Sequence, residues 1–148
     1  MLLKFRHSRQ RGISLLEVLL SLSVIAIILV MATRYYRSAN QSQQASNALS
    51  IISGVVTAET AYSAANSAYV FDIGTLNTDG YLPKSAMTDP WGGQVTVTKP
   101  TSGGGFQVSL AGPIPNTTTC MALDAMVKNG PALATSGCTG TSYWAQYQ

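Results

Sequence analysis

The sequence is poor in the residues on which most enzymes and metal sites depend. His7 is the only histidine in 148 residues, and it lies in a basic N-terminal stretch. Without a further histidine, imidazole acid–base catalysis and most zinc sites are excluded from the rest of the chain. Beyond the apolar run, the acidic residues are scattered without metal-loop spacing: Glu59, Asp72, Asp79, Asp89 and Asp124. We therefore expect no enzymatic activity, no metal and no cofactor.

Charge is also scarce, at 10% of residues, and it is unevenly placed. Four of the nine basic residues fall in the first twelve positions: Lys4, Arg6, Arg9 and Arg11. Without residues 1–12, five basic residues would remain against six acidic ones, and the formal net charge would change from +3 to −1. The alkaline isoelectric point therefore comes from this segment, and nucleic acid is not expected as the main partner.

A long apolar run follows Gly12. No charged residue occurs from Val18 to Thr33, and together with Ile13–Leu16 the run reaches about twenty residues, roughly 30 Å of helix. Such a segment is long enough to cross a bilayer. A secretory signal peptide is the alternative, but no small-x-small cleavage pattern closes the run before Arg34. The excess of basic residues before the run orients the N-terminus to the cytoplasm and the remainder to the outside.

Glu17 is an unusual residue for the start of such a helix. A carboxylate inside a membrane helix costs roughly 3 kcal/mol on insertion scales, so it normally has a partner or a role. No basic side chain follows it within two helical turns. Cleavage after Gly12 would turn the Ile13 nitrogen into an amine four residues before the carboxylate, and a helix N-terminus adds partial positive charge. We predict that Glu17 pairs with this amine, from its own chain or from a neighbouring subunit.

This arrangement resembles the signal of type IV pilins and pseudopilins, which have Gly before the cleavage point and Glu as the fifth mature residue. The residues that carry the resemblance are Gly12 and Ile13-Ser14-Leu15-Leu16-Glu17. It implies that a prepilin peptidase cuts between Gly12 and Ile13 on the cytoplasmic side and methylates the new amine. It also implies an inner-membrane precursor with a periplasmic globular domain, which the pilus assembly machinery polymerises into an extracellular helical filament.

A second helical pattern follows the apolar run. Small and apolar residues recur at spacings of three and four, as in an amphipathic helix: Ala45, Ala48, Leu49, Ile52, Val55, Val56, Tyr62 and Ala65. No proline interrupts residues 13–82, so we expect one helix of about fifty residues. A coiled coil is the alternative, but leucines at seam positions and flanking charges are scarce. Glu59 lies near the apolar stripe and is expected at a water-exposed edge, with a subunit contact as the alternative.

The remaining sequence predicts a small antiparallel sheet resting on this helix, and hence an α+β fold. Turn signals over residues 67–93 indicate a loop. The elements expected after it are strands at 94–99 and 106–110 joined as a hairpin, a helix at 119–128 and a terminal strand near Tyr143. Both tryptophans, Trp91 and Trp144, are expected to anchor the core.

The two cysteines, Cys120 and Cys138, are either unpaired core thiols or a disulfide. The expected topology places them outside the reducing cytosol, which favours the disulfide. This bond would close a loop of nineteen residues and contribute about 3 kcal/mol. A cysteine-bounded C-terminal region extends the resemblance to type IV pilins. The short helix after the first cysteine, and the proline-containing approach to it, are similar to the type IVb group of toxin-coregulated and conjugative thin pili.

The predicted organisation has three parts: a cleaved basic leader at 1–12, a transmembrane and assembly half-helix at 13–37 and a globular domain at 38–148. This domain is divided into a helix at 38–66, the loop at 67–93 and the sheet and C-terminal region at 94–148. The favoured function is a structural pilus subunit, for use in adhesion, conjugation or another surface process that the sequence does not specify. A minor pilin or a type II secretion pseudopilin is the first alternative. A membrane-anchored binding module that does not polymerise is the second.

Overall fold

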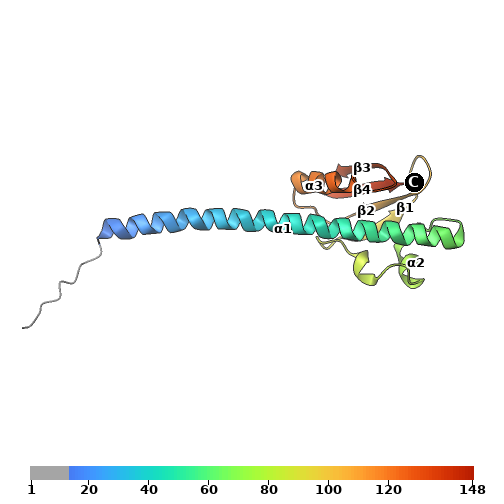
Figure 1. Cartoon of the computed structure of the whole chain (residues 1–148), viewed down its shortest axis with the longest axis horizontal. Coiled ribbons are helices and arrows are strands. Elements are labelled where there is room, and N and C mark those ends of the chain that lie inside the picture. The colour runs from blue at the N-terminus through green and yellow to red at the C-terminus, as the bar shows by residue number, and fades with distance from the viewer. Residues whose placement is uncertain (1–13) are drawn as a thin grey trace, which may run out of the picture. The chain divides into compact units, whose positions relative to one another are not determined.

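The computed structural model describes residues 14–148 (Figure 1). Helix α1 spans Leu15–Asn66, in agreement with the single long helix expected from a stretch without proline. The chain divides into two compact units after Ser38, so the boundary falls inside α1. The basic leader and both residues of the expected cleavage site, Gly12 and Ile13, lie outside the described residues.

The second unit contains a four-stranded antiparallel sheet with the strand order β1-β2-β4-β3 (Figure 1). Its strands are β1 (Val95–Thr98), β2 (Phe106–Leu110), β3 (Leu133–Thr139) and β4 (Ser142–Tyr147). The hairpin predicted for the first two strands is confirmed, as is the terminal strand. This terminal strand lies in the interior of the sheet, because β4 pairs with both β2 and β3.

The core of the second unit lies between α1 and one face of the sheet. Alternate strand residues are buried there, including Val97, Val108 and Tyr143. From α1, five small or branched residues at helical spacing are buried: Ala45, Ala48, Ile52, Val55 and Ala58. The predicted stripe is therefore confirmed over most of its length. Its last member, Ala65, is exposed near the end of the helix.

The segment expected to be a loop contains two short helices. Helix α2 spans Ile73–Thr78, and the 3-10 helix η1 spans Lys84–Met87. The carboxylate of Asp72 accepts hydrogen bonds from the backbone nitrogens of Gly74 and Thr75, at 3.3 and 3.0 Å, and so caps α2. These hydrogen bonds lower the pKa of Asp72, the one from the Thr75 hydroxyl having the largest effect. A good cap starts a helix that is too short to show a periodic pattern.

The two tryptophans differ in their surroundings. Trp91 packs against the core, and its indole nitrogen donates a hydrogen bond to the Gln44 side chain at 3.1 Å. Trp144 lies on β4 between two buried residues, Tyr143 and Ala145, and strand alternation therefore points it to the opposite face of the sheet. There its ring lies over Gly137 of β3. The expected core role is correct for Trp91 and wrong for Trp144.

Candidate assembly segment and C-terminal disulfide

The described part of the first unit is the candidate assembly segment, α1 up to Ser38, a mainly apolar helical segment whose side chains are exposed. Leu15 and Leu16 keep 79% and 73% of their surface accessible. Among the described residues, α1 is the one helix long and apolar enough to cross a membrane by length and composition. Exposing so much apolar surface to water is unfavourable, so this segment requires a bilayer or a protein partner.

The polar residues inside this segment satisfy their own hydrogen bonds. The hydroxyl groups of Ser21, Ser23 and Thr33 donate to backbone carbonyls three residues earlier, at 2.9, 2.7 and 3.0 Å. A hydroxyl that bonds to its own helix leaves no unpaired donor for an apolar environment. These residues are therefore compatible with a position inside the hydrocarbon.

Glu17 lies in the first turn of α1 with an exposed side chain. The Ser14 carbonyl accepts hydrogen bonds from the backbone nitrogens of Glu17 and Val18, at 2.9 and 3.2 Å, and this defines the first turn. Within residues 14–148, no lysine or arginine forms a salt bridge with Glu17. Because Ile13 lies outside these residues, the expected pairing of Glu17 with a freed amine stays a prediction.

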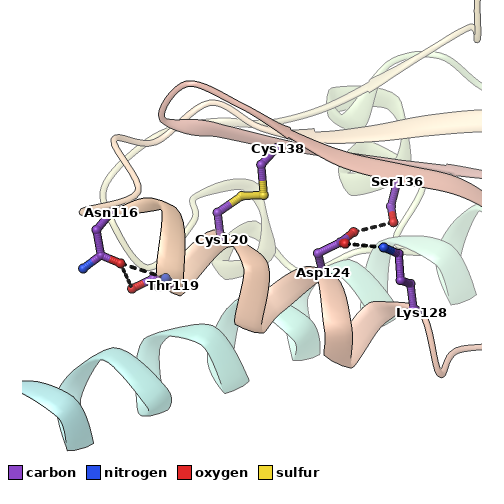
Figure 2. The surroundings of a disulfide bond; sticks show 7 residues. All are labelled: Asn116, Thr119, Cys120, Asp124, Lys128, Ser136 and Cys138. Atoms are coloured by element: carbon purple, nitrogen blue, oxygen red, sulfur yellow. Dashed lines mark hydrogen bonds and ion pairs between the residues drawn. A yellow bond between two sulfur atoms is a disulfide. The ribbon is translucent and has the colours of Figure 1, made fainter.

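The C-terminal region is closed by a disulfide between Cys120 and Cys138, with a Cα–Cα distance of 6.2 Å (Figure 2). Cys120 is buried on helix α3, which spans Thr117–Val127, whereas Cys138 is exposed on β3. The pairing expected from the sequence is confirmed. The bond ties the helix to the edge strand of the sheet, which packs on one neighbouring strand only.

Polar contacts stabilise α3 on both sides of Cys120, at the start of the helix and one turn after the cysteine (Figure 2). The Asn116 side-chain oxygen accepts a hydrogen bond from the Thr119 nitrogen at 2.7 Å and caps the helix. One turn beyond Cys120, Asp124 accepts a hydrogen bond from the Ser136 hydroxyl at 2.5 Å and pairs with Lys128 at 2.6 Å. Partial burial alone would raise the pKa of Asp124, but these two partners outweigh it and the pKa is lowered.

Glu59 is fully buried, so its expected position at a water-exposed edge is wrong. One carboxyl oxygen accepts a hydrogen bond from the Val70 nitrogen at 3.3 Å, and the other has no hydrogen-bond partner in the described part of the chain. Burial raises the pKa of Glu59 to about 7, and the bond from Val70 opposes this only in part. Burial equally rules out a direct subunit contact through this side chain in the folded chain.

Asp89 is a structural carboxylate that sequence reasoning did not identify. It is buried, and it accepts hydrogen bonds from the backbone nitrogens of Trp91 and Gly93, both at 2.9 Å, and of Gly112 at 2.7 Å. The first two close the turn after Asp89, and the third joins this turn to the residues that follow β2. The Asp-Pro pair at the start of a turn was the available signal.

Across residues 14–148, no three His, Cys, Asp or Glu side chains come together in a way that could hold a metal ion. Asp72 instead caps a helix, Asp89 closes a turn, Asp124 forms an ion pair and Glu59 lies buried, whereas Glu17 and Asp79 are exposed.

Comparison with known families bears on the N-terminal segment. Residues 7–33 match the prokaryotic N-terminal methylation motif. The chain thus carries a prepilin-type signal of the kind shared by type IV pilins and pseudopilins. This match covers residues 7–12 of the basic leader, including Gly12, and continues through Glu17 and the apolar part of α1 to Thr33; it does not distinguish pilin subgroups. No curated protein and no solved structure matches the chain.

Proposed function

We propose that this chain is the structural subunit of a type IV pilus-like filament. The observation that carries the proposal is the exposed apolar part of α1, with one carboxylate in its first turn, inside a prepilin-type signal. A bilayer covers this surface before assembly, and the same segments of neighbouring copies cover it afterwards. An uncleaved anchored module would need the bilayer alone and would have no use for Glu17.

The proposed sequence of events begins with cleavage after Gly12 and methylation of the Ile13 amine in the inner membrane. In the filament, the amine of one copy then pairs with Glu17 of a neighbour. At about 4 Å and an effective dielectric constant near 20, two such charges attract with roughly 4 kcal/mol before desolvation is subtracted. This attraction would set the axial register, while apolar contacts supply most of the cohesion.

We further propose that the chain belongs to the type IVb subgroup, because its C-terminal region resembles that of the subgroup. The helix α3 carries the first cysteine, is capped by Asn116 and follows Pro113 and Pro115. A disulfide joins it to the edge of the sheet. Outside the cell, a disulfide can stabilise a peripheral region that has too small a hydrophobic core of its own.

Mass spectrometry and electron microscopy test the proposal together. The mature chain should begin at Ile13 with one added methyl group, and sheared surface material should contain filaments made of this chain. Glu17→Gln should keep the level of membrane-inserted chain but reduce filament yield at least tenfold, because only the charge is removed. Ser21→Ala, which changes a self-bonded hydroxyl on the same segment, is the matched control and should assemble normally.

The alternatives give different results in the same experiment. Filaments that contain this chain only as a rare component would indicate a minor pilin. Processed chain without surface filaments would indicate a pseudopilin. A chain that still begins at Met1 in the membrane would contradict processing and favour the anchored binding module.

A further inference from the structure

The second unit has an open apolar groove of about 560 Å³ between α1 and the segment that enters η1. None of its lining residues is charged, and those central to the argument are Ile51, Gly54, Ala58, Ala61, Leu82 and Ala86. The groove is unfilled at Gly54, since a Cβ atom built there would meet no atom within 4 Å. Small residues on α1 leave room for another helix to approach closely.

Helix α3 presents an uncharged outward face that no element of its own unit covers. Apart from Thr117 at its start, its exposed residues recur at i, i+3, i+4, i+7 and i+8: Thr118, Met121, Ala122, Ala125 and Met126. The inward face buries Cys120, Leu123 and Val127 in the core. A helix that is apolar on both faces is normally covered on both faces, so the outward face indicates a protein partner.

The groove and the outward face of α3 match in length and in chemistry. The twelve residues of α1 from Ser50 to Ala61 extend about 18 Å along the groove, and the eleven residues of α3 extend about 17 Å. The small residues Ala122 and Ala125 allow close approach, and the flexible side chains of Met121 and Met126 adapt to an irregular cavity. The five residues of this face and the residues that line the groove carry no charge to be desolvated, and the exposed Lys128 borders the face one turn beyond Ala125.

We infer that the outward face of α3 on one copy seats in the α1 groove of the next copy. Within the second unit, α3 packs against β3 and β4, whereas η1, which contributes Ser85 and Ala86 to the groove, packs against β1 at the opposite edge of the sheet; α3 and α2 are labelled in Figure 1. The helix therefore cannot fill the groove of its own chain. Two different surfaces that bind each other form a heterologous contact, which repeats without limit when it does not close into a ring.

The size of this contact explains why it needs the filament. A standard interface buries about 800 Å² per partner over 20–30 residues, so the five-residue outward face of α3 buries roughly 130 to 200 Å². This area is too small for a stable free dimer. Copies whose N-terminal helices already bundle are held at high effective concentration, and a weak contact then forms. The inference rests on the proposed filament in this respect.

A groove-filling substitution tests the inference in cells that produce the full-length chain. Gly54→Leu places a side chain in open space and adds helix propensity, so the fold and the disulfide should persist. Sheared filament yield should nevertheless fall at least tenfold. Gly54→Ala is the matched control and should assemble normally. Ala125→Glu should give the same loss from the other side of the contact, whereas Thr141→Glu, at an exposed turn, should not.

Photo-crosslinking identifies the occupant. p-Benzoylphenylalanine in place of Met126 in assembled filaments should link to residues 50–61 of another copy of the chain. Normal filaments from Gly54→Leu, or a crosslink to a different protein or to a different surface, would overturn the docking and leave the filament itself established. A wild-type chain that forms no filaments at all would overturn both proposals.

Discussion

Replacing Glu59 with glutamine should stabilise the folded chain by an amount that grows from about pH 4.5 to pH 7 and stays constant above it. The side chain is buried, and one of its oxygens lacks a hydrogen-bond partner in the described residues. Glutamine keeps the shape and removes the charge. Burial raises the pKa of Glu59 from 4.5 to about 7 in the folded chain. At about 1.4 kcal/mol per pH unit, ionising this carboxyl inside the fold costs up to about 3 kcal/mol.

The sign of the pH dependence follows from the raised pKa of Glu59. Between pH 4.5 and 7, the folded chain holds a proton that the unfolded chain has lost. The stability linked to this proton is complete below pH 4.5 and is lost as the pH rises through 7. Glutamine does not titrate. The two proteins should therefore be equally stable near pH 4.5 and differ by up to about 3 kcal/mol at pH 8.

Urea unfolding of the detergent-solubilised chain, followed by tryptophan fluorescence with the disulfide intact, measures this difference from pH 4.5 to 8. Other shifted groups titrate outside the window, because burial raises the pKa of Tyr147 to about 12 and hydrogen bonds lower that of Asp72. Asp79→Asn, at an exposed site, serves as the control for a lost charge. A stability difference between wild type and Glu59→Gln that stays constant over this range would refute the reasoning.

Two further predictions concern the globular unit. Replacing both Cys120 and Cys138 with alanine should lower the free energy of unfolding by about 3 kcal/mol, measured by urea titration, because the closed loop no longer restricts the unfolded chain. Asp89→Ala should cost roughly 3 kcal/mol by the same assay, since it leaves three backbone nitrogens without an acceptor, one of them the buried Gly112 nitrogen. An equal effect of Asp79→Ala, at an exposed site without this network, would contradict the assigned role of Asp89.

The elements that could be predicted from the sequence are those with a strong local pattern. Strand β2 begins and ends where alternation places it, at Phe106 and Leu110. The long α1 follows from a proline-free stretch in which helical spacing continues after the apolar run. In both cases, the pattern of side chains and the buried face specify the same structure.

The elements that were missed depend on contacts distant in the sequence. Strand β3 contains small and polar residues without alternation, and its pairing with β4 and the disulfide at Cys138 hold it in place. Helix α2 has six residues, too few for a periodic signal, and it depends on the Asp72 cap. In such segments, tertiary contacts override local propensity.

The burial of Glu59 was missed for a related reason. Its spacing from Val55 places it on the inward face of α1, but a carboxylate is normally found in water. The segment after the helix turns back, and the Val70 nitrogen reaches the carboxyl group. Nothing in the sequence around Glu59 indicates that the segment containing Val70 covers its carboxyl group. The candidate assembly segment, in contrast, has its chemistry in consecutive residues, so Glu17 could be singled out directly.

Glu17 and Glu59 provide a matched test of how charge acts in this chain. Both lie on α1, and glutamine removes one negative charge at either position. If net charge governed assembly, the two variants would lose filaments alike. The structure predicts opposite outcomes, because Glu59 is buried while Glu17 is exposed and forms no salt bridge within the described residues. Glu59→Gln should assemble and gain stability at alkaline pH, whereas Glu17→Gln should insert into the membrane and fail to polymerise. Equal filament yields from the two variants would show that Glu17 has no specific partner.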